Sequence, residues 1–134
     1  MEEEMMEGGV VKKFLYVNRR APHGTIYAQE SLEVALIGAA FEQDVSMLFL
    51  DDGVFEVRKG QNTVTAGVKN FSPTYRALPM YDVEKLFVER ESMETRGMTE
   101  DDLIDLGDED VTIQVIGSAQ VTELMEQQDV ILTF

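Results

Sequence analysis

The sequence predicts a three-layer α/β fold with a mainly parallel sheet of about five strands and helices on both faces. Strand-like apolar runs alternate along the chain with segments of helical periodicity. The apolar run at 44–52 is also continuous enough for a strand buried on both faces, as in parallel sheets. The chain has 134 residues, of which 44% are hydrophobic, so it can form the core of one domain.

The first half of the chain begins with a predicted strand, a helix and a second strand. Residues 1–9 are expected to be a disordered acidic tail, and residues 10–134 a single domain. The strands are predicted over 10–18 and 44–52, and the helix over 26–41, with Thr25 as its N-cap. The helix is predicted because small and apolar residues recur every three or four positions, namely Ala28, Leu32, Ala35, Leu36 and Ala39.

The second half continues the alternation after an irregular stretch. Residues 53–67 are predicted to be a loop with at most one helical turn, and 68–81 to be helical in pieces broken by Pro73 and Pro79. Three strands are then expected at 83–89, 111–116 and 129–134, with Phe134 packed. Between them we expect a short helix that Gly97 ends, a charge-rich loop over 99–110 that Thr99 caps, and a helix over 118–128 capped by Ser118.

The composition limits the chemistry that this chain can carry out. There is no cysteine, which excludes disulfides, thiolate metal sites and a persulfide on this chain. The single histidine, His23, argues against zinc, and we expect neither a metal nor a cofactor. The net charge of -15 disfavours direct binding to nucleic acid or anionic lipid. It fits either simple solubility or an acidic face that docks a basic partner.

The location of the protein is predicted from two features of the sequence. No apolar run reaches the roughly 20 residues that span a bilayer. The acidic start, "MEEEMMEGG", does not resemble a signal or transit peptide. The protein is therefore expected to be cytoplasmic and not bound to a membrane.

The first candidate site is "RAPHGT" (20–25), between the first strand and the first helix. Gly24 and Thr25 can offer backbone N–H groups to a phosphate or flavin at the helix N-terminus. Neither a dinucleotide-binding nor a P-loop motif is present, so a tight turn shaped by Pro22 and Gly24 is the alternative. His23 is a general base on the first interpretation and a structural or interface residue on the second.

The second candidate is "FLDDGVF" (49–55), at the end of the second predicted strand. Its paired aspartates could bind magnesium or act as acid and base. Adjacent side chains on an extended chain point to opposite sides, however, so one aspartate at most faces a site. Gly53 is predicted to have a positive φ. With Val54 and Phe55 after it at least partly exposed, the pattern favours a docking surface over a metal site.

Two further segments are rich in aromatic or acidic residues. Phe71, Tyr75 and Tyr81 are interleaved with Arg76, which permits base stacking but favours core or interface packing in so acidic a chain. The segment 89–110 is predominantly acidic. It is either a solvated face or a contact for a basic partner.

Several separated motifs together resemble the TusC/DsrF family of sulfur-relay subunits. They are "APHGT", "QESLEVAL", "LFLDDGVF", "KGQ", "YDVE", "ESMETRGM" and "DVILTF". The resemblance extends from about Lys12 to Phe134. The stretches "KNFSPTYRAL" and "GTIYAQESLEVALIGAAFEQDV" are closer to the DsrF branch than to the TusC branch.

The resemblance implies a DsrE-like (flavodoxin/Rossmann-like) fold and a non-catalytic subunit of a DsrEFH-type sulfur-transfer complex. DsrE-like and DsrH-like sister subunits, two copies of each chain, and a DsrC-like acceptor are the implied partners, in the oxidation of stored sulfur. The persulfide cysteine of the sister subunit corresponds here to Val88 or Glu89.

Interface candidates on this chain are His23, Gly24, Asp52, Gly53, Val54, Phe55, Phe71 and Tyr75. The alternatives are a TusC-type subunit of the relay for tRNA 2-thiouridine, a small flavin- or nucleotide-binding protein that uses the 18–25 turn, and a free-standing homo-oligomeric binding module.

Overall fold

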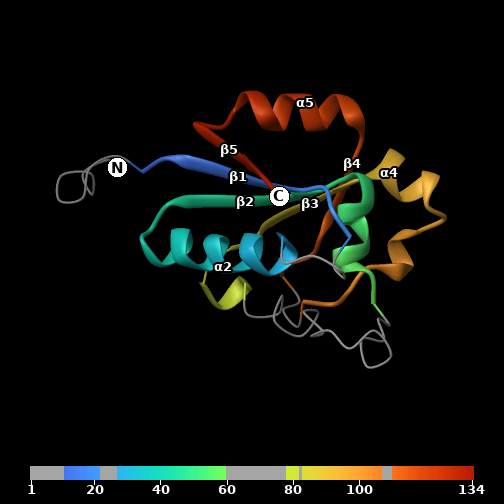
Figure 1. Cartoon of the computed structure of the whole chain (residues 1–134), viewed down its shortest axis with the longest axis horizontal. Coiled ribbons are helices and arrows are strands. Elements are labelled where there is room, and N and C mark those ends of the chain that lie inside the picture. The colour runs from blue at the N-terminus through green and yellow to red at the C-terminus, as the bar shows by residue number, and fades with distance from the viewer. Residues whose placement is uncertain (1–10, 22–26, 60–77, 82, 107–109) are drawn as a thin grey trace.

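Parallel strands form one sheet in the order β4-β3-β2-β1-β5 (Figure 1). The computed structural model describes residues 11–21, 27–59, 78–81, 83–106 and 110–134. Within them the strands are β1 (Lys13–Asn18), β2 (Asp44–Phe49), β3 (Lys85–Glu89), β4 (Gln114–Ile116) and β5 (Val130–Thr133). The predicted parallel α/β fold is therefore confirmed, and the structure adds the order of the strands.

Helices cover the two faces of this sheet. Figure 1 shows α2 (Tyr27–Ala40) on one face and α5 (Ser118–Glu126) on the other. The remaining helical elements are α4 (Arg90–Thr95) and the 3₁₀ helices η1 (Asp51–Val57), η2 (Leu78–Tyr81) and η3 (Glu100–Asp102). No helix in these described ranges is long and apolar enough to cross a membrane.

The core lies in two layers because successive strand side chains point to opposite faces. Tyr16 of β1 belongs to the larger cluster, which includes Leu32 and Ala35 of α2. Its neighbours Leu15 and Val17 belong to the second cluster, with Val121 of α5. This two-sided burial explains why the central strands are continuously apolar, and each such side chain contributes about 1.5–3 kcal/mol.

The end of α2 is a Schellman motif with an unusual residue at its left-handed position. The Gln43 N–H donates to the Gly38 carbonyl at 3.1 Å, and the Glu42 N–H donates to the Ala39 carbonyl at 2.9 Å. Glu42 has a φ of 61°, a conformation that glycine adopts more easily. The two hydrogen bonds therefore end α2 although Glu42 disfavours the left-handed conformation that the motif requires.

The end of α4 uses the same motif with the expected residue. The Met98 N–H donates to the Met93 carbonyl at 2.9 Å, and the Gly97 N–H donates to the Glu94 carbonyl at 3.2 Å. Gly97 has a φ of 72°. The prediction that Gly97 ends this helix is confirmed. Thr99 is the N-cap of η3, also as predicted, and the Asp102 carboxylate accepts its N–H at 2.9 Å.

Some predicted boundaries were wrong. β2 ends at Phe49 because Asp51, with a φ of 52°, turns the chain into η1, which has seven residues and more than the single turn predicted. β4 has three residues rather than six. Gly117, not Ser118, is the N-cap of α5, and its N–H donates to the Gln120 side chain at 2.9 Å. The Thr25 cap, the tail at 1–9 and most of 68–81 lie outside the described residues.

The C-terminal residue packs as predicted. The Phe134 N–H donates to the Val17 carbonyl at 2.8 Å, and its carbonyl accepts the Arg19 N–H at 2.9 Å. Its ring lies edge-on to the Tyr16 ring, with 6.1 Å between centroids. These contacts fix β5 to β1 at the edge of the sheet.

Candidate functional site at the carboxyl end of the sheet

The "DDGVF" corner is bound closely to the end of β1. The Leu50 N–H donates to the Asn18 carbonyl at 3.1 Å, and the Gly53 N–H donates to the Leu50 carbonyl at 2.9 Å. A Cβ on Gly53 would lie 1.8 Å from the Asn18 carbonyl oxygen. This glycine is therefore required by the close approach of two backbone segments.

Two predictions about this corner were wrong. Gly53 does not have a positive φ, and the left-handed residue is Asp51, two positions earlier. Val54 is fully buried rather than exposed, because η1 turns it into the core beneath α2. Phe55 is half-buried, and the Arg58 guanidinium lies 5.1 Å from its ring centroid. Asp52 is the one candidate of this corner that is exposed, and so the corner offers little surface for docking.

The two aspartates bind arginines from different elements. The Asp51 carboxylate pairs with Arg19 at 2.7 Å, and the Asp52 carboxylate pairs with Arg96 at 2.9 Å. They therefore have separate partners, and neither is arranged with the other to hold a metal. The prediction that they point to opposite sides assumed an extended chain, whereas both aspartates lie in η1. No group of three or more metal-binding side chains occurs in the part of the chain that the structure describes.

A hydrogen-bonded chain links the carboxyl ends of β2, β3 and β4. The Asp51 N–H donates to Ser92 Oγ at 2.9 Å, and the Ser92 hydroxyl donates to the Glu89 carboxylate. The Ser118 hydroxyl donates to the other Glu89 oxygen at 3.2 Å. Glu89 is half-buried at the end of β3 and is the N-cap of α4, whereas Val88 is fully buried in the core.

Glu91 satisfies the start of α5. Its carboxylate accepts the Ser118 N–H at 3.1 Å. Hydrogen bonds from its own backbone N–H and from that of Ser118 lower the pKa of the Glu91 carboxyl group. This carboxylate lies at the N-terminus of α5, where the helix dipole favours a negative charge.

These contacts join the ends of three neighbouring strands through one carboxylate. Ser92 is buried, and its hydroxyl donates to a carboxylate that also binds Ser118. Ser118 is exposed, but its hydroxyl, like that of Ser92, donates to Glu89, and the arrangement holds three strand ends together. The sequence did not predict this network, because its contacts form only when the sheet places Asp51 and Ser118 next to Glu89 and Ser92.

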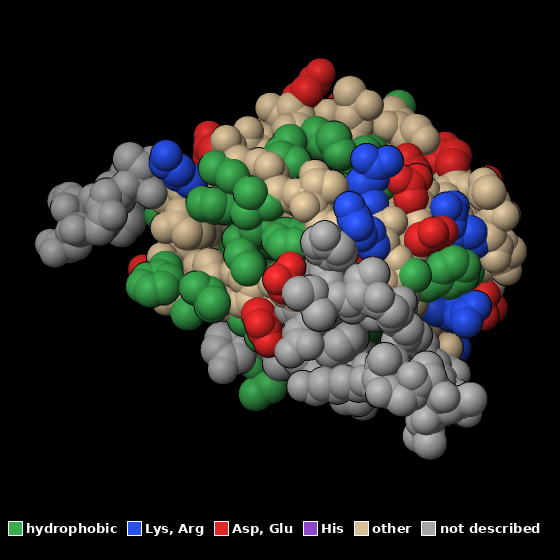
Figure 2. Space-filling view, in the orientation of Figure 1, with side chains coloured by type: hydrophobic (Ala, Val, Ile, Leu, Met, Phe, Trp, Pro, Cys, Tyr) green, Lys and Arg blue, Asp and Glu red, His purple; other side chains and the backbone are tan. Residues whose placement is uncertain are grey.

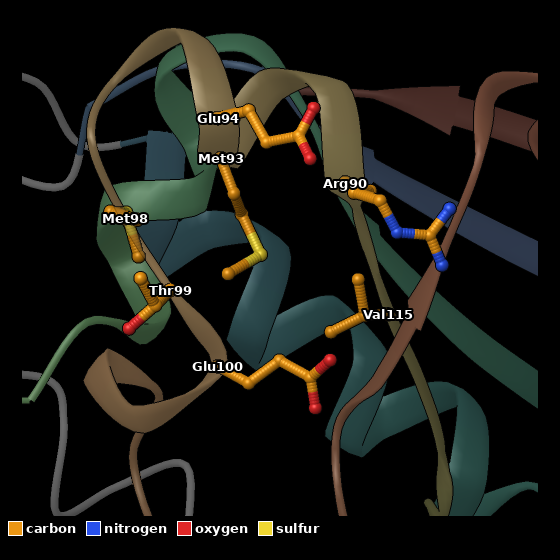
Figure 3. A pocket seen from close by; sticks show the side chains of 7 residues that line it. All are labelled: Arg90, Met93, Glu94, Met98, Thr99, Glu100 and Val115. Carbon is orange, nitrogen blue, oxygen red and sulfur yellow. The ribbon is translucent and has the colours of Figure 1, made fainter.

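A shallow pocket lies next to this network. It has a volume of about 290 Å³ and lies between α4, the segment 98–100 and β4. Figure 3 shows the Met93 thioether extending into it, with Val115 opposite and the carboxylates of Glu94 and Glu100 at its rim. The Schellman motif at Gly97 brings Met93 and Met98 together. The glycine between the two methionines in "METRGM" is the sequence signal for this motif, so their proximity could have been predicted.

His23, Gly24, Phe71 and Tyr75 lie outside the described residues. They remain predictions, as does the flavin or nucleotide site in the 18–25 turn. Of the candidates that are described, the structure brings the "DDGVF" corner and Glu89 together through Ser92.

Comparisons with known proteins agree with this architecture. A model of the DsrE/DsrF-like family matches residues 12–134. The chain is 54% identical to the intracellular sulfur oxidation protein DsrF of Allochromatium vinosum, over 93% of this chain and 98% of that protein. It is 32% identical to a TusC homolog of Pseudomonas aeruginosa, over 91% of this chain and 98% of that protein.

A solved structure supports the fold. The crystal structure of the ychN protein from E. coli superposes with a TM-score of 0.74 at 20% identity, covering 93% of this chain and 100% of that chain. At this identity the likeness concerns the fold alone. The family match and the two sequence relatives go further: the chain belongs to the DsrE/DsrF-like family.

Proposed function

We propose that this chain is a non-catalytic structural subunit of a cytoplasmic DsrEFH-type sulfur-transfer complex that acts in the oxidation of stored sulfur. The observation that carries the proposal is the 54% identity, over nearly the whole chain, to a protein named as an intracellular sulfur oxidation protein. Two copies each of this chain, a DsrE-like subunit and a DsrH-like subunit form the proposed complex. It delivers sulfur to a DsrC-like acceptor.

The non-catalytic role follows from the absence of cysteine in the whole sequence. A persulfide needs a thiolate, and no other side chain can hold a sulfane sulfur in the same way. In our proposal the persulfide forms on a cysteine of the DsrE-like sister subunit, and this chain supports the assembly in which that cysteine works.

Glu89 is the residue that we match to the sister subunit's cysteine. It lies at the end of β3, where its side chain can reach other strand ends, whereas Val88 is fully buried. The Glu89 carboxylate binds Ser92 and Ser118 and so stabilises the strand ends. We propose that this position has a structural role here and a chemical role in the sister subunit.

The alternative within the family is a TusC-type subunit of the relay for tRNA 2-thiouridine. The lower identity to the TusC homolog, 32% against 54%, favours the sulfur-oxidation role. Deletion of the gene distinguishes the two roles. Loss of stored-sulfur consumption with normal 2-thiouridine supports our proposal, and loss of 2-thiouridine supports the alternative.

A reconstituted transfer assay tests the proposed function. A persulfide donor is mixed with the DsrE-like and DsrH-like subunits and a DsrC-like acceptor, with or without this chain, and sulfur on the acceptor is measured by mass spectrometry. We expect transfer to depend on this chain although no sulfur is found on it. Equal transfer without this chain would contradict the proposal.

A further inference from the structure

The outer edge of β5 is the most open edge of the sheet. β5 pairs with β1 on one side, and no described strand pairs with its other side. Phe134 directs its N–H and carbonyl to β1. Because these groups alternate along a strand, the N–H and carbonyl groups of Ile131 and Thr133 point outward. They can pair with a further strand.

Apolar side chains accompany this open edge on both of its faces. Ile131 and Leu132 are neighbours, so they point to opposite faces of the sheet. They are 42% and 38% exposed, respectively. An edge strand that carries exposed apolar residues and no charged side chain between Val130 and Phe134 lacks the usual protection against pairing.

The adjoining side of α2 extends this apolar surface. Val34, Ile37 and Phe41 follow one another at spacings of three and four, so they lie along one side of the helix. Val34 is half-buried, while Ile37 and Phe41 are 57% and 74% exposed. Figure 2 looks onto this side of the molecule and shows hydrophobic side chains gathered over β5 and the adjoining part of α2.

Tyr16 connects the two parts of the surface. A Cβ on Gly38 of α2 would lie 3.0 Å from the Tyr16 hydroxyl, and the Phe134 ring packs on the Tyr16 ring at 6.1 Å. Gly38 lies on the same side of α2 as Val34 and Phe41. The stripe on α2 and the β5 edge therefore flank one buried tyrosine and form one surface. We call it the β5–α2 surface: Val34, Ile37, Phe41, Leu132 and Phe134.

Charge argues against a second copy of this chain as the partner. Around the surface the exposed charges are mixed: Glu30, Glu33 and Glu42 lie on or just after α2, whereas Lys12, Lys13, Arg19 and Arg20 lie at the two ends of β1. The chain as a whole carries a net charge of -15. A second copy would bring two such charges together, which opposes self-association. A different chain that lacks this excess of negative charge does not meet the same repulsion.

We propose that the β5–α2 surface docks an extended apolar segment of a sister subunit in the sulfur-transfer complex. The segment pairs with the outward groups of Ile131 and Thr133 and covers Ile37, Phe41 and Leu132. This inference rests on the proposed function and assigns its assembly to one surface of the chain.

A pair of matched variants tests the assignment. Phe41→Ser removes an exposed apolar side chain of the surface, and Met80→Ser removes one from η2, where Met80 is 82% exposed. Because both side chains are exposed, neither change should affect folding, and circular dichroism checks this. We expect Phe41→Ser to weaken binding to the sister subunits by roughly 30-fold and Met80→Ser to leave it unchanged.

Hydrogen exchange on the complex tests the strand pairing. The amides of Ile131 and Thr133 should exchange more slowly in the complex than in the free chain. The surface is wrongly assigned, while the proposed function stands, if the wild-type chain binds the sister subunits, Phe41→Ser binds them equally tightly, and the Ile131 and Thr133 amides exchange as fast in the complex as in the free chain. If the wild-type chain does not bind the sister subunits, the proposed function fails and the inference with it. Self-association that Phe41→Ser abolishes would also overturn the inference, because the occupant would then be a second copy.

Discussion

Replacing Gly53 with alanine tests whether the "DDGVF" corner is held by backbone contact. The new Cβ would lie 1.8 Å from the Asn18 carbonyl oxygen and 2.5 Å from its carbonyl carbon. Neither atom belongs to a flexible side chain, so relief requires moving the end of β1 away from η1. That movement strains the hydrogen bond from the Leu50 N–H to the same Asn18 oxygen. Overpacking costs about 1–3 kcal/mol in general, and we expect about 3 kcal/mol or more here.

The assay is urea unfolding followed by circular dichroism, with Gly97→Ala as the matched control. Gly97 has a φ of 72°, and a methyl group added there would meet no other atom within 4 Å. Alanine at position 97 therefore destabilises the fold only through its left-handed backbone conformation. That cost is about 1 kcal/mol. The reasoning is refuted if Gly53→Ala loses no more unfolding free energy than Gly97→Ala.

Three further changes test other parts of the structure. Glu42→Gly should raise the unfolding free energy by about 0.5–1 kcal/mol, since the left-handed residue of the α2 Schellman motif becomes a glycine; no gain in the urea midpoint would contradict this. Ser92→Ala should cost about 1–3 kcal/mol, because the Asp51 N–H and the Glu89 carboxylate lose a partner; an unchanged urea midpoint would show that the network contributes nothing. Burial raises the pKa of the Tyr16 hydroxyl above its ordinary value of 10.0, so this tyrosine's contribution to stability is complete below pH 10 and declines as the pH rises beyond it. Tyr16→Phe should therefore lose less unfolding free energy than the wild type between pH 9 and 11, roughly the range in which an unfolded tyrosine ionises. Parallel plots of unfolding free energy against pH for the two proteins would contradict the raised pKa of Tyr16.

The sequence predicted those parts of the fold that depend on local pattern. The apolar run before Asp51 predicted a strand buried on both faces, and Gly97 predicted the end of a helix by its own conformational freedom. The strand order could not be predicted, because pairing β5 with β1 rather than with β4 depends on contacts between distant segments.

The wrong predictions concern residues whose roles depend on contacts with other parts of the chain. Gly53 was expected to supply a positive φ, but its role is to let two backbones approach, and no local signal distinguishes the two uses of glycine. Val54 was expected to be at least partly exposed after a turn at Gly53, yet η1 turns it inward. Ser118 was expected to cap α5, but Glu91 and Gln120 satisfy the first N–H groups instead.

The candidate site was predicted only in outline. Resemblance to the family pointed to Val88 or Glu89, and the structure separates a buried strand residue from one at a strand end. The links from Glu89 through Ser92 to Asp51 join residues 38 positions apart, as counted from Asp51 to Glu89. Such a network depends on how neighbouring strands align in the sheet, and this alignment cannot be predicted from a single sequence.

Native mass spectrometry tests the central claim, that this chain is a subunit of a hetero-oligomeric sulfur-transfer complex. The chain is produced alone and together with its DsrE-like and DsrH-like sister subunits, and the masses of the intact particles are compared. We predict a particle that contains two copies of each chain. A stable particle of this chain alone that does not combine with either sister would contradict the claim.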